Sequence, residues 1–326
     1  MTDHAVEERH GSQRGSRPKG LGLERKETLT GYFCISPWLL GMAAFFVVPM
    51  LYSLWLSLTH YSGLGAPRFA GLANYTRMLQ NELFWTSISN TLIYSLMFVA
   101  PSVIGSLLCA MLLNQQIRGR TFFRSVFFLP SITPIVAAMF LWMWILQPKV
   151  GLFNYLLSIV GVDGPGWLGS TRWSKPALAM ISLWGAIGGR PMLIFLAALQ
   201  GVPNEYIEAA EIDGASAWRK FISITVPIIS PIVLFNTLIA GITALQMFEI
   251  AYIASAPQGQ QHELGGPGRS TLSYVLNLYI RTFQDFDMGY GSALAWFFFA
   301  VVLLATFLFM RSSRGWVFYE STEAHD

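Results

Sequence analysis

The chain has 326 residues, of which 53% are hydrophobic and only 12% are charged, and its formal net charge is +3. Soluble domains usually carry about 25% charged residues, so this composition excludes an ordinary soluble domain. The small positive charge gives no argument for a nucleic-acid partner.

The charged residues are clustered and leave long intervals that hold no Asp, Glu, Lys or Arg: 28–67, 83–117, 125–148, 221–248 and 288–310. Each is longer than the roughly 20 apolar residues that a membrane-spanning helix needs. A sixth apolar stretch, 176–200, is interrupted only by Arg190. Since the stretches lack the alternation of a barrel strand, we predict an all-α, polytopic membrane protein of six transmembrane helices. The expected spans are 32–57, 86–113, 124–147, 177–199, 223–253 and 289–311.

The distribution of Lys and Arg predicts the orientation. With six spans, thirteen basic residues fall on the side of the two termini and seven on the other side. Because positive residues favour the cytoplasm, we expect both termini to be cytoplasmic. The polar segment 1–30 is expected to be a disordered cytoplasmic tail, and 31–326 a single membrane domain with the first span as its own uncleaved signal.

The fourth predicted span contains an interruption. Arg190 lies between Gly188-Gly189 and Pro191, where glycines and a proline predict a kink or break. The fifth span carries the polar residues Asn236, Gln246 and Glu249. Polar groups inside lipid are costly, so they either line a path for a polar solute or pair with one another and hold helices together. The residues alone leave both interpretations open.

The loop at 201–222 between these spans is polar. Pro203-Asn204 predicts a helix start with Asn204 as N-cap, Gly214 predicts its end, and Ser216 predicts the cap of a second short helix. Small residues at 209 and 210 would allow close approach of another surface. An amphipathic connector on the membrane surface is the alternative, and local physics does not decide between the two.

The sequence EAAEIDGA at 208–215, followed by Pro227, strongly resembles the EAA loop of bacterial ABC importer permeases, and more narrowly those of carbohydrate importers of the maltose and glycerol-phosphate type. The similarity covers nearly the whole chain and includes 69–75, 118–130, 196–200, 265–268 and 286–293. Val226 and Gly185 depart mildly from the family's pattern. The resemblance implies a type-1 ABC importer transmembrane domain with its core at about 86–311, in a bacterial plasma membrane.

The resemblance also implies roles and partners. The loop at 201–222 would couple the chain to an ATPase through these residues, the last the weakest match: Glu208, Ala209, Ala210, Asp213, Gly214 and Ala215. The expected partners are a second permease, two ATPase subunits, an external sugar-binding protein and membrane lipid. The sugar path is not carried over from the family: if the polar residues line a path, Arg190, Asn236, Gln246 and Glu249 would line it, with Phe248 stacking on sugar rings.

No phosphate-binding loop with its Gly-Lys-Ser/Thr occurs in the chain, and no catalytic or metal constellation. We therefore expect a transporter subunit rather than an enzyme, with no cofactor of its own and with ATP and Mg²⁺ on the partner ATPase. The sequence leaves two alternatives: an importer for a non-sugar such as glycerol phosphate, and a secondary transporter driven by protons or sodium.

Overall fold

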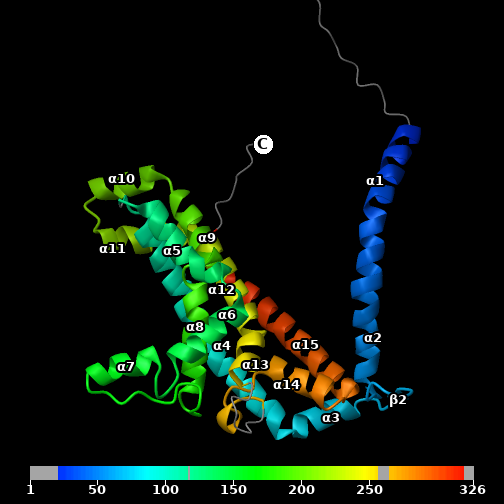
Figure 1. Ribbon diagram of the computed structural model, residues 1–326. Coiled ribbons are helices and arrows are strands. Elements are labelled where there is room, and N and C mark those ends of the chain that lie inside the picture. The colour runs from blue at the N-terminus through cyan, green and yellow to red at the C-terminus, as the bar shows by residue number, and fades with distance from the viewer. Residues whose placement is uncertain (1–20, 117, 256–263, 319–326) are drawn as a thin grey trace, which may run out of the picture. The chain divides into compact units, whose positions relative to one another are not determined.

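The computed structural model describes residues 21–116, 118–255 and 264–318, and the chain divides into two compact units, Met1–Ser53 and Leu54–Asp326 (Figure 1). The first unit is one long helix, formed by α1 (Leu21–Met42), a π-helical turn (Ala43–Val47) and the start of α2 (Val48–Ser57). The helix begins before the apolar run because Leu, Glu, Arg and Lys are strong helix formers. The tail boundary expected at residue 30 therefore lies inside α1, and 1–20 lie outside the described residues.

The described residues of the second unit form helices and one two-stranded hairpin. Its antiparallel strands pair Thr59 with Phe69 and His60 with Arg68. Its elements in chain order are the end of α2, β1 (Thr59–His60), β2 (Arg68–Phe69), α3 (Ala73–Gln80), α4 (Glu82–Asn114), α5 (Arg120–Ile132), α6 (Ile135–Ile145), α7 (Leu152–Ile159), α8 (Ser174–Ala186), α9 (Arg190–Gln200), α10 (Asn204–Ile212), α11 (Ala217–Lys220), a π-helical turn (Phe221–Thr225), α12 (Val226–Leu245), α13 (Glu249–Ser255), a 3₁₀ turn (Pro267–Arg269), α14 (Tyr274–Tyr279), a π-helical turn (Ile280–Gln284) and α15 (Met288–Ser313).

Among the described residues, the helices give four candidate spans, or six if each of two bent helix pairs forms one span. Four helical segments are long and apolar enough to cross a membrane: Arg25–Ser57, Glu82–Asn114, Ala217–Ser255 and Met288–Ser313. Two further spans are bent pairs: α8 and α9 meet at 49°, and α5 and α6 meet at 97°. The kink between α8 and α9 was predicted from its glycines and Pro191. The span expected at 124–147 corresponds to α5 and α6, and the bend between them was not predicted: Pro130 and Pro134 interrupt the helix.

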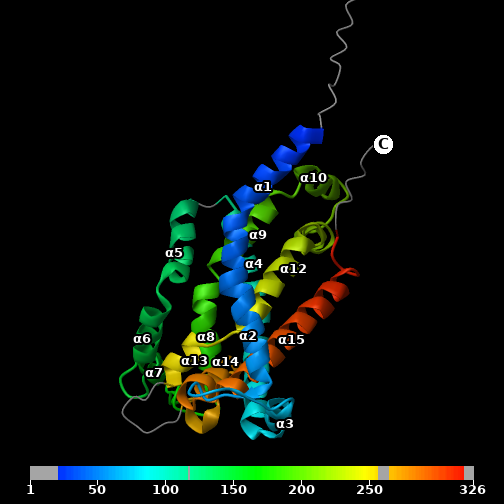
Figure 2. The ribbon, with the colours of Figure 1, turned by 90° about the vertical axis from the view of Figure 1, so that its right-hand side faces the viewer.

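Helix α4 is the centre of the second unit and packs against α8, α9, α12 and α14. Its side chains join two buried clusters. Tyr94 and Phe98 pack with Leu178 of α8, whereas Cys109 and Leu113 pack with α9 and α12. Figure 2 shows α12 and α15 side by side, running towards the end of the unit that carries α10. The long helix α4 thus fixes the positions of the helices that pack against it.

Glycines allow α8 to approach α5 very closely. A Cβ atom added to Gly188 would lie 2.0 Å from the Phe127 carbonyl oxygen, and one on Gly189 would lie 3.0 Å from the Ser131 Cβ. Backbone-to-backbone contact of this kind is typical of small residues between membrane helices. The glycines that follow α8 therefore both interrupt the span and allow it to pack closely against α5.

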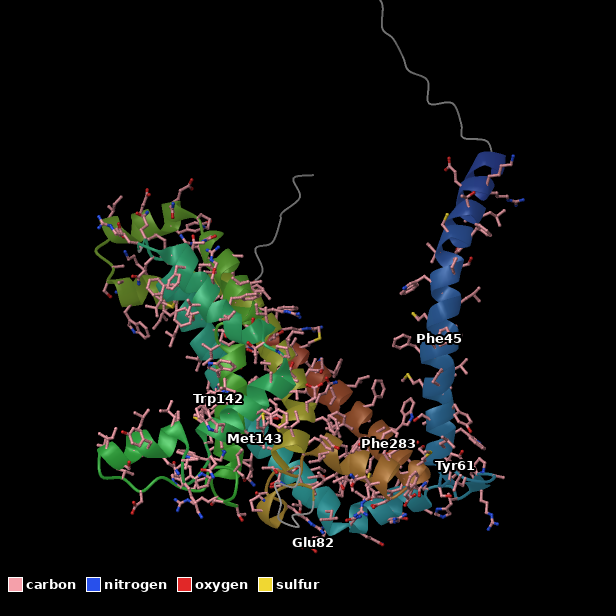
Figure 3. All side chains as sticks on the ribbon, in the orientation of Figure 1. Phe45, Tyr61, Glu82, Trp142, Met143 and Phe283 are labelled. Atoms are coloured by element: carbon pink, nitrogen blue, oxygen red, sulfur yellow. The ribbon has the colours of Figure 1, made fainter. Side chains whose placement is uncertain are left out.

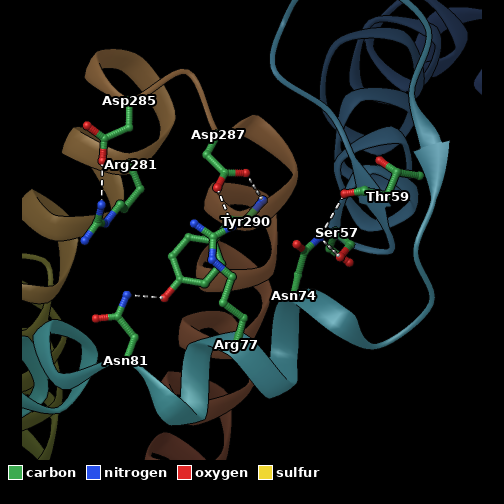
Figure 4. A network of polar contacts seen from close by, with 9 residues as sticks. All are labelled: Ser57, Thr59, Asn74, Arg77, Asn81, Arg281, Asp285, Asp287 and Tyr290. Carbon is green, nitrogen blue, oxygen red and sulfur yellow. Dashed lines mark hydrogen bonds and ion pairs between the residues drawn. The ribbon is translucent and has the colours of Figure 1, made fainter.

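A polar network closes the end of the unit opposite α10, where α3 meets the hairpin and α15 (Figure 4). The buried Asn74 amide donates to the carbonyl oxygens of Ser57 and Thr59 at 2.9 and 2.8 Å. Arg77 forms an ion pair with Asp287 at 2.6 Å and lies over the Tyr290 ring at 4.6 Å. These contacts fix α3 and the hairpin to the first turn of α15.

The Gly188 contact generates a prediction. Gly188→Ala should destabilise the protein by about 1–3 kcal/mol, since the new methyl group meets a backbone oxygen that has no rotamer to move to. The measurement is the thermal unfolding midpoint of the purified transporter. Gly241→Ala in α12 is the control, because nothing lies within 4 Å of its added Cβ. Equal midpoints for the two variants would contradict the packing described for α5 and α8.

Candidate functional site

Three helix breaks meet at one pocket of about 500 Å³ inside the bundle of spans. The breaks lie between α5 and α6, at the end of α8, and between α12 and α13. The lining residues used below are Tyr94, Phe98, Ser131, Thr133, Ser182, Trp184, Gly185, Thr243, Gln246, Phe248 and Glu249. In lipid, irregular backbone is tolerated only where it is buried in protein or lines a cavity. Broken helices near the membrane midplane are also where transporters place their substrate sites.

The break between α5 and α6 follows from its prolines. Pro134 has no N–H to donate and holds Thr133 in an extended conformation, at φ −70° and ψ 130°. The Thr133 N–H donates instead to the Pro130 carbonyl at 3.2 Å. The break brings the side chains of Ser131 and Thr133 to the pocket, where their hydroxyls also donate to backbone carbonyls of α5 at 2.8 and 3.1 Å. The Pro-x-x-x-Pro spacing was a signal in the sequence that the span prediction did not use.

The break between α12 and α13 brings three of the five predicted path residues together. Gln246, Phe248 and Glu249 line the pocket, and the Gln246 and Glu249 side chains are exposed. The Phe248 carbonyl accepts from the Tyr252 N–H at 2.8 Å, which starts α13. Glu249 thus places a carboxylate, and Gln246 an amide, at the edge of a largely aromatic cavity.

The aromatic wall comes from α4 and α8. The rings of Tyr94 and Phe98 stack, with centroids 5.8 Å apart and planes 7° apart. The Tyr94 hydroxyl donates to Ser182 Oγ at 2.7 Å, and Trp184 follows two residues later in α8. Figure 3 labels Trp142 on α6, whose ring meets Trp184 edge-on at 5.9 Å. Sequence reasoning missed Tyr94, Phe98 and Ser182, since aromatic and hydroxyl residues in an apolar run carry no local signal of a pocket.

The other two predicted path residues lie elsewhere. Asn236 is 2% exposed, and its amide donates to the Ile232 carbonyl of its own helix at 3.2 Å. Arg190 is the first residue of α9, is exposed, and does not line the pocket. The structure therefore does not bring Arg190 and Asn236 to this pocket.

The loop at 201–222 folds as helix, glycine turn, helix. Gly214 has φ +72°, its N–H donates to the Glu211 carbonyl at 3.0 Å, and the Ala215 N–H donates to the Ala210 carbonyl at 2.9 Å. This is a Schellman C-terminus, which requires a left-handed residue at the position of Gly214. The predicted N-cap is wrong: Pro203 precedes the helix and Asn204 is its first residue. Pro203 has an extended backbone, with φ −62° and ψ 130°, so the helix begins at the residue after it, Asn204.

The second helix confirms its predicted cap. The Arg219 N–H donates to Ser216 Oγ, and Lys220 forms an ion pair with Glu211 of α10. The two short helices are therefore held together as one unit, with the Gly214 turn between them.

The outer face of this loop exposes two large apolar side chains. Ile212 is 88% exposed and Trp218 69% exposed, although both lie in a polar segment. Of the residues predicted to couple to an ATPase, Glu208, Ala209, Asp213 and Gly214 are exposed, whereas Ala210 and Ala215 are half-buried. Beneath α10, a groove of about 690 Å³ runs between Tyr206, Ala209 and the start of α12. Exposed large apolar residues beside a groove mark a surface for protein contact.

The family of binding-protein-dependent transport system inner membrane components has a model that matches residues 102–316. This match covers most of the chain, and it includes the α10–α11 loop and all of the pocket lining except Tyr94 and Phe98. The chain belongs to this family.

Its relatives are named as transporter permeases. The chain is 39% identical to the probable ABC transporter permease protein YesP of Bacillus subtilis (strain 168), over 92% of this chain and 95% of that protein. It is 33% identical to the trehalose/maltose transport system permease protein MalF of Thermococcus litoralis, over 90% of this chain and 96% of that protein. It is 31% identical to the lactose transport system permease protein LacF of Rhizobium radiobacter, over 90% and 96%.

The fold is also similar to a solved structure. A chain of a bacterial alginate ABC transporter, crystallised in complex with an alginate pentasaccharide-bound periplasmic protein, superposes with a TM-score of 0.77. The identity is 22%, and the match covers 90% of this chain and 97% of that chain. This protein is thus a multi-pass inner-membrane permease subunit of an ABC importer, and not an enzyme.

The structure places Gln246 in the pocket and Asn236 outside it, although both were predicted to line the sugar path. Gln246→Ala should lower maximal transport several-fold, because it removes a polar group that faces the cavity. Asn236→Ala should leave the maximal rate unchanged and cost about 0.5–1.5 kcal/mol of stability, because its bond lies within its own helix. Uptake into proteoliposomes and thermal unfolding of both variants are the measurements. The assignment of the two residues is contradicted if their effects on uptake are the same.

Proposed function

We propose that this chain forms one half of the path by which an ABC importer carries a sugar or oligosaccharide across the membrane. The observation that carries the proposal is the pocket at the three helix breaks, which combines aromatic rings with hydroxyl, amide and carboxylate groups. Sugars offer apolar ring faces and many hydroxyls, so they are matched by this mixture. The names of the relatives given above support the same class of substrate.

The lining groups suggest how a sugar would be held. Phe248 and the Tyr94–Phe98 pair provide ring faces, while Gln246 and Glu249 accept hydrogen bonds from sugar hydroxyls. The negative charge of Glu249 would repel a phosphate group, which favours a sugar over glycerol phosphate. The family membership of the chain does not support the other alternative, a secondary transporter driven by protons or sodium.

The proposed partners follow from the loop. A second permease would complete the path, an external binding protein would deliver the sugar, and two ATPase subunits would bind ATP and Mg²⁺. Glu208, Ala209, Ala210, Asp213 and Gly214, with Ala215 at the edge, would form the coupling contact, with the exposed Ile212 among them. The positive-residue bias supports a cytoplasmic position for this loop and for both termini.

The chain also offers a mechanical link. Helix α11 continues through the π-helical turn Phe221–Thr225 into α12, and α12 ends at Gln246 in the pocket wall. Twenty helical residues span about 30 Å, so a displacement of the loop would reach the pocket through one rigid helix. In the proposed cycle, ATP closes the ATPase dimer and the loop moves with it. Helix α12 then moves, and the pocket opens to the outside to take the sugar.

A screen of the cognate binding protein tests the substrate class. Mono- and oligosaccharides should raise its thermal midpoint, and the sugar that does so should be taken up by proteoliposomes that carry the transporter and internal ATP. The proposal is overturned if the stabilising ligand is an amino acid, a peptide or a phosphate ester and no sugar is transported.

The Gly214 turn tests the coupling role. Gly214→Val should cost at least about 1–2 kcal/mol locally, because a β-branched residue is strained at positive φ, and should sharply reduce binding-protein-stimulated ATPase activity. Gly214→Asn is the matched control, since Asn tolerates this conformation and should retain most activity. Subunit assembly is checked by co-purification. Full stimulation in an assembled Gly214→Val complex would refute the coupling role of the turn.

A further inference from the structure

Helix α7 presents an apolar stripe that no other described residue of the second unit covers. The stripe consists of Leu152, Tyr155, Leu156, Ile159 and Val160, whose exposed fractions are 50%, 64%, 51%, 67% and 78%. At 3.6 residues per turn these five side chains occupy an arc of about 140° on one side of the helix. No residue from 150 to 162 is charged. A connecting loop in water would not keep so much apolar surface exposed.

The opposite side of α7 is fastened to the body of the protein. The buried Asn154 amide donates to the carbonyls of Pro148 and Pro165 at 3.0 and 3.2 Å, and its Oδ1 accepts from Trp167 Nε1 at 2.7 Å. The Phe153 ring packs edge-on against Trp167, with centroids 5.7 Å apart. The exposure of the stripe is therefore built into the fold, because α7 cannot roll to bury it without breaking three hydrogen bonds.

The position of α7 agrees with a membrane surface. It lies crosswise to α8, at the end of the spans opposite α10, as Figure 1 shows in green. Helix α6, which contacts α7, also exposes large apolar side chains, since Phe140 and Trp144 are 61% and 63% exposed. The chain enters α7 directly after α6 and then leads into α8, so the helix stays within reach of the bilayer.

We infer that α7 lies in the membrane–water interface, with the stripe in the acyl boundary of the outer leaflet. An interfacial helix lies parallel to the membrane plane with its apolar side inserted, and Tyr155 has the amphipathic ring that is favoured at this depth. The exposed Lys149, just before α7, is placed to reach lipid phosphates. A protein partner is less well matched, because a protein interface surrounds its apolar centre with a polar rim. The inference depends on the membrane location of the family and not on the identity of the substrate.

The helix would thereby anchor two walls of the pocket. Trp167 and Phe153 connect α7 to Trp142 of α6, and Ile181 of α8 belongs to the same buried cluster. Both α6 and α8 line the pocket. An interfacial α7 would hold this end of both helices at a fixed depth while α12 moves.

Spin-label accessibility tests this inference in the assembled transporter in lipid nanodiscs. Leu156→Cys is made in a background in which the two native cysteines are replaced, Cys34→Ser and Cys109→Ala, and is labelled with a nitroxide. Collisions with oxygen, which concentrates in lipid, are compared with collisions with a water-soluble nickel chelate. The oxygen-to-nickel ratio should be several-fold higher at Leu156 than at Ser158→Cys, which is exposed about 160° away around the same helix.

Two results would overturn the inference. A nickel accessibility at Leu156 equal to that at Ser158 would place the stripe in water. A label that is immobilised and shielded from both reagents would mean that another protein covers the stripe. Tyr155→Cys is a second reporter on the stripe and must give the same result as Leu156→Cys. If the Leu156→Cys variant does not assemble, Tyr155→Cys replaces it. Sugar uptake by the labelled variants confirms that the transporters are functional.

Discussion

The structure depends on one constraint, which is that backbone N–H and C=O groups inside a bilayer must be satisfied by the protein itself. Unbroken helices meet this requirement in α4 and α15. The chain breaks its helices at Thr133-Pro134, after Gly185 and at Gln246–Phe248, and these three breaks converge on one cavity. Backbone groups that lack a helical hydrogen bond would be costly against lipid. At these three breaks they lie beside the cavity, where a polar solute would form hydrogen bonds with them. The aromatic wall of Tyr94 and Phe98 on α4 completes that cavity.

A single continuous segment links this cavity to the α10–α11 loop. The loop is held in shape by short-range bonds, namely the Schellman turn at Gly214 and the Glu211–Lys220 ion pair. From α11 the chain runs without a break through α12 to Gln246. Tight packing at Gly188 seats the end of α8 against α5, so that the pocket has a fixed wall opposite the end of α12. The arrangement suits a protein that must turn movement at one surface into a change of access inside the membrane.

The sequence predicted those features whose causes are local. Hydropathy over about 20 residues predicted six spans, which match four long helices and two bent helix pairs, and the glycines with Pro191 predicted the kink between α8 and α9. The glycine turn and Ser216 cap of the loop were also predicted correctly, since caps and left-handed positions depend on residues close in the chain. The break between α5 and α6 was missed because apolar residues continue through Pro130 and Pro134, and hydropathy does not register a missing N–H.

The sequence by itself therefore determined that this protein is a helical membrane protein with a structured polar loop, because burial in lipid and helix capping are set within short segments. Only the tertiary structure decided which side chains share a cavity. Gln246, Phe248 and Glu249, at the break after α12, face it, while Asn236 within α12 bonds to the backbone of its own helix. Tyr94 and Ser182 reach it from spans far apart in the sequence. That outcome depends on how each helix is rotated and where the breaks meet. Both are fixed by packing between distant segments such as α4, α8 and α12, for which no single stretch of sequence carries the information.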